Sequence, residues 1–327
     1  MKDQYFGDIR DWFKYVVLRV LLRKGLTLTA GWMLTEEDSS GDGELRGYLQ
    51  GQPVNRRVDP ELYQWLLQWQ ESGAPREVQQ IERSGLLGEA RFHRALLTDD
   101  AAARDAWFAA LYEVAAGSDV VFLDPDNGLE VRSHPRGKGK SSKYVYWREI
   151  VELWNRGHSV VVHQHFARVT RRSFLRGRLE ELFRFFPAER GIAIHTMDTM
   201  FLIVARPEHW ERLAGVIEAI GATDDRRLHA EELGRETLER LTRPIDYEAA
   251  LREDNRMLLG GGGEAINRNE QQVVRKTDLP GSERDQKMYV MRCLRCAHEY
   301  GCNGIEIFQR KCPRCQGGPA ALDVWVH

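Results

Sequence analysis

The chain has 327 residues, of which 42% are hydrophobic, and its formal net charge is only −2. This length suits one main domain with an appendage, and the near-neutral charge excludes nucleic-acid binding by bulk charge, so that any such binding must come from local basic patches. The sequence lacks both the roughly 18 to 20 uninterrupted apolar residues of a membrane helix and the apolar core of a signal peptide. We therefore expect a cytoplasmic protein that does not enter a membrane, and the confinement of all five cysteines to residues 293–315 agrees with this expectation.

Apolar periodicity predicts helices that alternate with short strands through the first 250 residues. The predicted helices cover residues 11–23, 60–83, 101–116, 143–156, 168–186, 207–221 and 229–242. The predicted strands cover residues 26–34, 119–123 and 159–163, with one or two more within 191–205. This alternation predicts an α/β domain over residues 1–250, in which a mostly parallel sheet carries helices on both faces.

The remaining chain divides into a linker and a small metal-binding module. Residues 251–287 have the polarity and glycine content of a flexible linker. Residues 288–327 contain two C-x-x-C knuckles separated by a spacer of 15 residues, 297–311; their cysteines are Cys293, Cys296, Cys312 and Cys315. Four thiolates at this spacing predict a tetrahedral structural zinc site, and the regular knuckles favour Cys302 and His298 as bystanders. The pattern resembles a zinc ribbon.

Polar side chains follow two of the predicted strands. Asp124, Asp126, Asn127 and Glu130 come directly after the apolar strand 119–123. His163 and His165 end the strand at 159–163 and should point to one face of it, because side chains alternate along a strand. Strand ends of a parallel sheet are where sites form, so we predict a site here with Asp124, Asp126, Asn127, His163 and His165 as its catalytic residues. The alternative is that Asp-Pro and Asn-Gly are only turn formers and the histidines only satisfied strand ends.

Basic residues flank this predicted site. A basic loop that we expect to be flexible runs from Arg132 to Lys143, and five arginines fall between Arg168 and Arg178. This clustering suits a polyanionic substrate, DNA or RNA. The side chains that we predict to bind nucleic acid are Lys138, Lys140, Lys143, Arg168, Arg171 and Arg172.

The order of these segments resembles the bacterial methyltransferases that modify an adenine N6 in the large ribosomal RNA. The likeness runs from about residue 5 to residue 220. The segment Asp124-Pro125-Asp126-Asn127 stands in the place of the family's catalytic Asp/Asn-Pro-Pro-aromatic tetrapeptide. The resemblance implies a Rossmann-like methyltransferase-type sheet, S-adenosylmethionine as methyl donor, and an Asp124 carboxylate and Pro125 carbonyl that hold the exocyclic amine of an unstacked base. The cofactor-binding positions that it implies are Lys14, Gly31, Trp32, Asp42 and Tyr48. The Gln4–Asp8, Trp32–Thr35, Asp124–Gly128 and Gln164–Phe166 peptides also resemble those of a set of uncharacterised bacterial proteins.

Two other functions stay open. Asp126 and Asn127 replace the second proline and the aromatic residue of the tetrapeptide, and carboxylates at these strand ends suit a divalent cation. A Mg or Mn site made of Asp124, Asp126, Glu130, His163 and His165 would give a nuclease or phosphodiesterase. The third hypothesis is a non-catalytic adaptor that binds nucleic acid, in which a degenerate methyltransferase fold carries a zinc ribbon.

Overall fold

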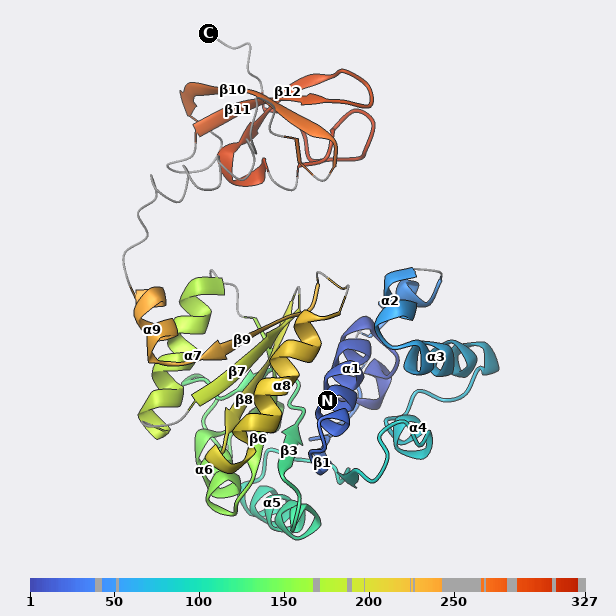
Figure 1. Ribbon diagram of the computed structural model, residues 1–327, viewed down its shortest axis with the longest axis vertical. Coiled ribbons are helices and arrows are strands. Elements are labelled where there is room, and N and C mark those ends of the chain that lie inside the picture. Colours follow the sequence, from blue (N-terminus) through green and yellow to red (C-terminus); the bar gives the residue numbers. More distant parts are fainter. Residues whose placement is uncertain are drawn as a thin grey trace. The chain divides into compact units, whose positions relative to one another are not determined.

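The computed structural model describes residues 1–38, 43–50, 53–166, 171–186, 190–196, 198–223, 225, 227–242, 266–267, 269–280, 287–307 and 310–322. These residues form two compact units, Met1–Arg243 and Pro244–His327. The first unit holds a central mixed sheet flanked by helices, and the second holds a small antiparallel sheet (Figure 1). The second unit also contains a cluster of four cysteines. Within the described ranges, no helix combines the length and apolar character needed to cross a bilayer.

The helices of the first unit largely follow the apolar pattern. They are α1 (Ile9–Arg23), α2 (Pro53–Val58), α3 (Pro60–Ser72), α4 (Gln79–Arg83), α5 (Ala101–Ala115), α6 (Trp147–Asn155), α7 (Arg171–Phe185), α8 (Trp210–Gly221) and α9 (Arg235–Thr242). Short 3₁₀ turns cover Asp3–Tyr5, Gly47–Leu49, Ser141–Lys143 and Pro207–His209. The single helix expected over residues 60–83 is wrong, because α3 ends at Gly73 in a left-handed conformation (φ 67°) and the chain restarts as α4.

The strands of the first unit are β1 (Leu28–Gly31), β2 (Arg91–His93), β3 (Val120–Leu123), β4 (Gly128–Leu129), β5 (Tyr144–Val145), β6 (Ser159–His165), β7 (Arg190–His195), β8 (Thr199–Ala205) and β9 (His229–Leu233). Among the described residues, seven of these strands form the central sheet in the order β2-β1-β3-β6-β8-β7-β9. The first four are parallel, whereas β8 is antiparallel to both β6 and β7, and β9 is antiparallel to β7. The sheet is therefore mixed rather than mostly parallel.

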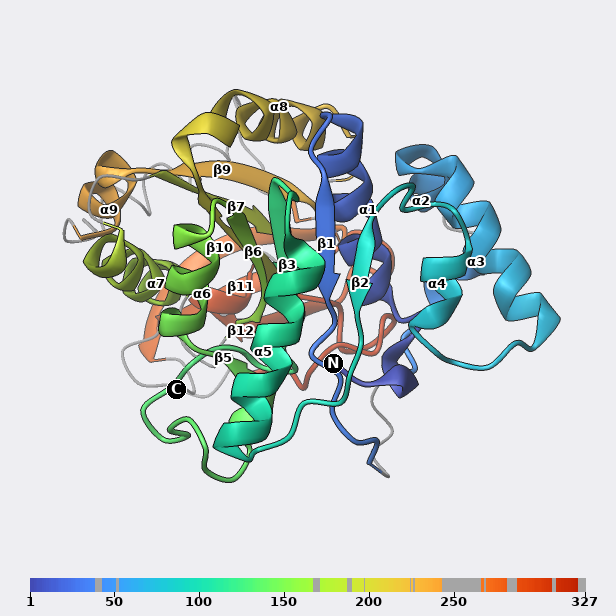
Figure 2. The same ribbon diagram turned by 90° about the horizontal axis from the view of Figure 1, so that it is seen from below.

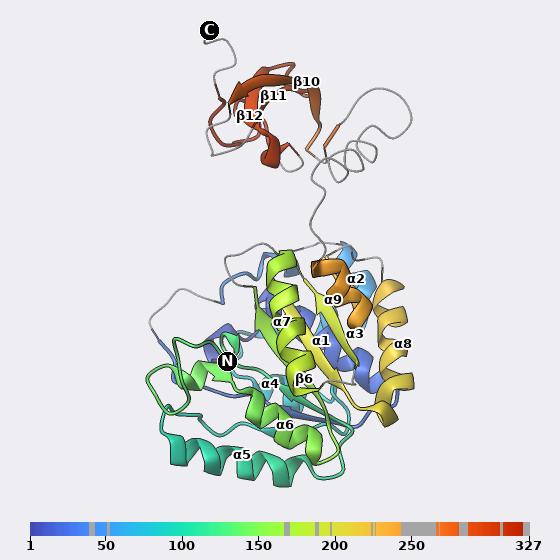
Figure 3. The same ribbon diagram turned by 90° about the vertical axis from the view of Figure 1, so that its left-hand side faces the viewer.

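Each face of the sheet carries its own apolar core. Helices α1, α3 and α8 pack with Phe122, Val161 and Phe201 on one face (Figures 1 and 2). Helices α5, α6 and α7, seen together in Figure 3, pack with Val121, Val160 and other residues on the opposite face. Because both faces are covered, β3 and residues 160–162 of β6 are continuous apolar runs without alternation.

The order of the strands creates a switch point between β1 and β3. The connection that follows β1 runs through α2, α3 and α4 to β2, on one side of β1. The connection that follows β3 runs through α6 to β6, on the opposite side. The two connections diverge here, so a crevice opens beyond the carboxyl ends of β1 and β3. In open α/β sheets this crevice is the usual ligand site.

The second unit is built from β10 (Gln271–Pro280), β11 (Lys287–Cys293) and β12 (Glu299–Asn303), followed by a 3₁₀ turn at Gly304–Glu306. The three strands pair in an antiparallel sheet. Residues 251–287 were expected to be a flexible linker, but β10 lies within them, so this part of the prediction is wrong. Residues 251–265, with the glycine run, lie outside the described residues.

Candidate functional site

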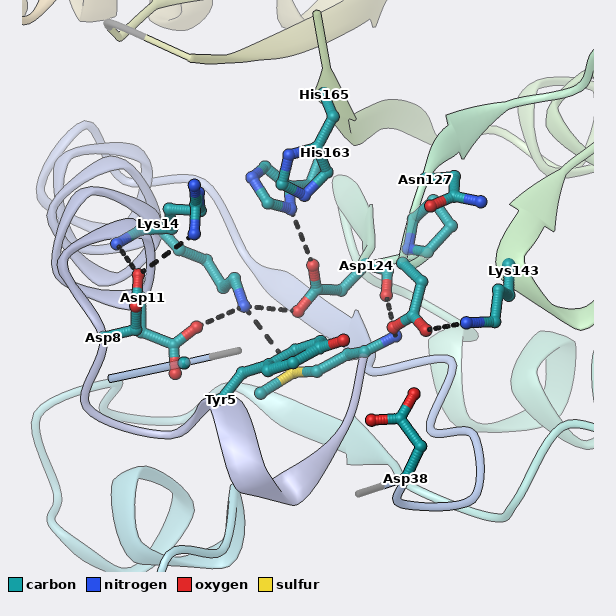
Figure 4. A pocket seen from close by; sticks show the side chains of 15 residues that line it. Tyr5, Asp8, Asp11, Lys14, Asp38, Asp124, Asn127, Lys143, His163 and His165 are labelled. Atoms are coloured by element: carbon teal, nitrogen blue, oxygen red, sulfur yellow. Dashed lines mark hydrogen bonds and ion pairs between the residues drawn. The ribbon is translucent and has the colours of Figure 1, made fainter. Parts of the chain in front are cut away.

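A pocket of about 310 Å³ lies at the switch point, within the size range of small-molecule sites. Its walls come from the 3₁₀ turn at Asp3–Tyr5, helix α1, the loops after β1 and β3, and the end of β6 (Figure 4). The lining residues are Met1, Tyr5, Asp8, Arg10, Asp11, Lys14, Asp38, Gly43, Asp124, Pro125, Asp126, Asn127, Lys143, His163 and His165. The structure therefore brings together all five predicted catalytic residues, although their roles stay predictions.

Lys14 and Asp124 form the buried centre of this pocket. The Nζ of Lys14 lies 2.6 Å from Oδ2 of Asp124 and 2.7 Å from Oδ1 of Asp11, one turn earlier on α1. The other carboxylate oxygen of Asp124, Oδ1, lies 3.0 Å from Nδ1 of His163. Helix α1 presents Lys14 to the strand ends because Asp8 caps it, accepting a hydrogen bond from the backbone N–H of Arg10.

Asp124 and Lys14 stabilise each other's ionised form. Burial alone would raise the pKa of Asp124, but Lys14 and His163 stabilise the carboxylate and hold its pKa below the ordinary value. Burial would lower the pKa of Lys14, but Asp11 and Asp124 outweigh burial and raise it. Asp124 is therefore ionised and Lys14 is protonated, and the pair offsets the cost of burying each charge alone.

The two histidines at the end of β6 both line the pocket. A carboxylate only accepts hydrogen bonds, so the 3.0 Å contact requires Nδ1 of His163 to carry a hydrogen and donate it to Asp124; in the tautomer with this one ring hydrogen, Nε2 is a lone-pair acceptor. That Nε2 is buried and has no hydrogen-bond partner among the described residues. The ring of His165 lies 5.1 Å from the ring of His163, and burial, reinforced by the nearby charge of Arg10, lowers the pKa of His165 to about 3.

Asp126 sits in a second ion-pair network on the other side of the pocket. Its Oδ1 lies 2.6 Å from the α-amino group of Met1, and its Oδ2 lies 3.5 Å from Nζ of Lys143. Burial would raise the pKa of Asp126, but these two cations lower it. Thr35, after β1, donates a hydrogen bond of 3.3 Å to the same carboxylate.

Gln164 holds the Asp124–Asn127 loop in place, a role that the sequence analysis missed. Its side-chain amide donates to the carbonyl of Asn127 at 3.0 Å and accepts from the backbone N–H of Leu129 at 2.7 Å. Gly128 lies against this amide with φ 108°, and a Cβ there would stand 2.4 Å from Gln164. The Asn-Gly peptide is thus needed for close packing, a reason that only the neighbouring strand reveals.

Of the four implied cofactor positions that the structure describes, only Lys14 lines the pocket. Gly31 faces Leu111 and Leu123, and Trp32 is fully buried with its ring parallel to that of Phe92. Tyr48 is also buried and donates a hydrogen bond to the carbonyl of Gly7. The structure thus places these three positions in the packed interior, away from the lining of the pocket, and Asp42 lies outside the described residues.

Glu130 does not join the other acidic residues. Its carboxylate accepts a hydrogen bond of 2.8 Å from the backbone N–H of Trp147, where it caps α6, and it does not line the pocket. In the part of the chain that the structure describes, the four knuckle cysteines are the only group of three or more His, Cys, Asp or Glu residues close enough to share a metal ion.

The four cysteines do come together. The sulfur atoms of Cys293, Cys296, Cys312 and Cys315 all lie within 4.8 Å of one another. This cluster could hold a metal ion such as zinc, since four thiolates form the usual tetrahedral shell of a structural zinc site. Cys302 and His298 lie outside the cluster.

The predicted nucleic-acid-binding residues occupy different settings. Lys138 and Lys140 are exposed, whereas Lys143 reaches Asp126 in the pocket. The guanidinium of Arg171 lies 4.6 Å from the centre of the Phe166 ring, and that of Arg172 donates to the carbonyl of Arg240. Arg168 lies outside the described residues.

Comparison of the chain with models of known protein families and with curated proteins finds no match.

Proposed function

We propose that the chain is a nucleic-acid-modifying enzyme that transfers a methyl group from S-adenosylmethionine to an amine of a base. The observation that carries this proposal is the buried Lys14–Asp124–His163 cluster at the switch point of the sheet, in which Nε2 of His163 has no hydrogen-bond partner among the residues that the structure describes. The parallel strands β2, β1, β3 and β6, with helices on both faces, support a Rossmann-like, methyltransferase-type reading of the fold.

The lining of the pocket suits the charges of S-adenosylmethionine. This molecule carries a cationic sulfonium together with an ammonium and a carboxylate. The pocket is lined by carboxylates of Asp8 and Asp38 and by cations of Arg10 and Lys143, beside the buried central pair. These groups also pair within the protein, Arg10 with Asp8 and Asp198, Asp38 with Lys2 and Lys143 with Asp126, so the bound molecule would exchange partners with them. Once bound, S-adenosylmethionine would supply an electrophilic methyl group.

The residues of the chain would position the amine and take its proton. The Pro125 carbonyl accepts one N–H of the amine, which turns the nitrogen lone pair toward the methyl carbon. On methyl transfer the electron pair of the breaking carbon–sulfur bond would go to sulfur, and Nε2 of His163 would take the proton that the amine loses. Asp124 stabilises the imidazolium, and Lys14 keeps Asp124 ionised and oriented. Asp124, expected to hold the amine directly, acts here through His163 because both its oxygens are already engaged.

The ion pairs favour this reaction over hydrolysis assisted by Mg or Mn. A divalent cation would have to displace Lys14 from Asp124 and both the Met1 amine and Lys143 from Asp126. Glu130, the third expected ligand, is used to cap α6. These carboxylates are neutralised by the protein's own cations.

For the second unit we propose a zinc ribbon with one structural zinc ion on the four knuckle cysteines. The convergence of the four sulfur atoms supports this assignment. Basic side chains at the knuckles, Arg314 and Lys311, are exposed and suit a role in gripping nucleic acid.

The proposed function is tested by incubating the full-length chain with methyl-labelled S-adenosylmethionine and separate RNA and DNA fractions. Label should enter one fraction, and His163→Gln should lower the initial rate about 100-fold or more, because it removes the proton acceptor. His229→Gln, at an exposed position outside the pocket, is the matched control. Absence of label from every nucleic-acid fraction, with the chain folded, would contradict methyl transfer and favour the adaptor hypothesis.

A further inference from the structure

The loop between β4 and β5 is closed at its base beside the pocket. Strands β4 and β5 pair in parallel, and the backbone N–H of Asn127 donates to the carbonyl of Lys143 at 2.9 Å. The N–H of Glu130 donates to the carbonyl of Val145 at 2.8 Å. Residues 130–143, which we call the basic arm, therefore leave the pocket edge and return to it.

Asp99, just before α5, anchors the far part of this arm. Its Oδ2 accepts a hydrogen bond of 2.7 Å from the backbone N–H of Lys140, and its Oδ1 accepts one of 2.7 Å from that of Ser142. Lys140 has φ 70°, the left-handed conformation that glycine normally occupies. The anchor therefore holds a lysine in a backbone conformation that the residue would rarely adopt alone.

A buried arginine fixes the return of the arm. Arg104 on α5 is fully buried, pairs with both carboxylate oxygens of Glu149, and donates to the carbonyls of Ser141 and Tyr144. The hydroxyl of Tyr146 donates to the carbonyl of His134 at 2.8 Å. The expected flexible loop is thus tied to α5 and α6 along its length.

The arm carries its positive charge outward. The side chains of Arg132, Lys138 and Lys140 are exposed, and the described residues form no ion pair or side-chain hydrogen bond with them. Lys143, at the end of the arm, lies in the pocket. Because the backbone that carries these cations is already fixed, the arm loses less conformational entropy when it binds a partner.

We propose that the basic arm is a preformed site for the phosphate backbone of a nucleic acid, with Lys138 and Lys140 contacting phosphates next to the nucleotide that enters the pocket. This inference rests on the proposed function for its nucleic-acid substrate, and it assigns Asp99 as the positioning residue. Arm and pocket are joined through Lys143, so a bound strand would be held beside the reactive centre.

Substitution of Asp99 offers a test, because its loss of charge and its loss of anchoring predict opposite changes in the affinity for nucleic acid. Asp99→Asn removes a negative charge near two lysines, which by Coulomb attraction alone strengthens binding of a polyanion. The same change replaces one acceptor oxygen by an NH2 group, which cannot accept the backbone N–H of Lys140 or of Ser142 that it faces, so one of the two anchoring hydrogen bonds is lost. Asp100→Asn is the matched control, because it removes the neighbouring charge while asparagine still caps α5.

The experiment titrates full-length protein into fluorescein-labelled 20-nucleotide single strands of RNA and of DNA, without S-adenosylmethionine, and follows anisotropy over a range of KCl concentrations. We expect Lys138→Ala/Lys140→Ala to weaken binding on the order of tenfold and to reduce the slope of log K against log [KCl] by about 1.4, or about 0.7 for each phosphate contact. We expect Asp99→Asn to weaken binding and Asp100→Asn to leave it equal or tighter.

An unchanged salt slope in the double lysine variant overturns the proposal, as does the absence of binding by the parent chain. Binding by Asp99→Asn as tight as by Asp100→Asn overturns the positioning role of Asp99, provided that circular dichroism shows both variants folded. Because no methyl donor is present, these results are independent of methyl transfer. A lysine-dependent salt slope in a chain that methylates nothing would keep the arm and reject the proposed reaction.

Discussion

At the residue scale, His165 should make the stability of the protein depend on pH. Burial lowers the pKa of His165 from an ordinary 6.5 to about 3, so the unfolded chain binds a proton between these values and the folded chain does not. The free energy of unfolding therefore falls as pH drops from about 6.5 toward 3, by up to about 1.4 kcal/mol per pH unit.

Replacement of His165 by asparagine removes this proton difference. Urea unfolding at pH 6 and at pH 5 should show a smaller loss of stability in His165→Asn than in the parent chain. An identical loss in the two proteins would mean that His165 titrates in the folded state as it does in the unfolded state.

Gly128 should tolerate no side chain. A Cβ would stand 2.4 Å from the Gln164 amide, and φ is 108°, so Gly128→Ala should lower the free energy of unfolding by about 1 to 3 kcal/mol. Gly139→Ala, in the same loop region, meets nothing within 4 Å and has no positive φ, so it should change stability little. Equal denaturation midpoints for the two variants would refute the tight packing of Gln164 on the Asn127–Gly128 turn.

The residues of the site differ in how far sequence could reveal them. Asp124, His163 and His165 could be predicted because each follows an apolar run, and polar groups at buried strand ends gather at one edge of a sheet. Asp11 and Gln164 could not, because an acidic residue in a helix and a glutamine in a strand show no pattern before their neighbours in space are known. Trp32 was expected in a cofactor loop because it follows β1, and the packing of its ring on Phe92 could not be predicted from its neighbours along the chain.

At the element scale, the cysteine knuckles should bind metal as a unit. Replacement of Cys312 and Cys315 by serine leaves two thiolates, so we expect mass spectrometry under native conditions to show the loss of one zinc ion per chain. Cys302→Ala is the matched control, because Cys302 is a buried cysteine outside the cluster and its loss should leave the metal content unchanged. A metal content that is equal in all three proteins would reject the proposed zinc site.

Elements with strong apolar patterns were predicted better than edge strands. Helices α1 and α5 and strands β3, β7 and β8 lie within a few residues of their predicted bounds. The helix expected over residues 229–242 is wrong in its first half, because β9 is an edge strand whose charged Glu231 and Glu232 break the alternation of a strand. Strand β10 was missed for a similar reason, since a polar strand of a small sheet resembles a linker.

At the scale of the whole molecule, the switch point explains why the pocket lies where it does. Helix α1 supplies Lys14 and Asp11, β3 leads into Asp124, and β6 ends in His163, so the cluster needs three elements that are distant in sequence. The α/β class could be predicted from alternating helices and strands. The antiparallel position of β8 between β6 and β7 could not be predicted, because the residues of a fully buried strand do not show which strands it pairs with.

The most direct test of the central claim is a calorimetric titration of the full-length chain with S-adenosylmethionine. We predict binding at one site per chain, and we predict that Asp124→Asn, checked by circular dichroism to be folded, weakens it strongly because Lys14 and His163 lose their shared partner. If the folded parent chain gives no binding heat at any temperature tested and no labelled S-adenosylmethionine is retained in equilibrium dialysis, the switch-point pocket is not a methyl-donor site and the proposed reaction is contradicted.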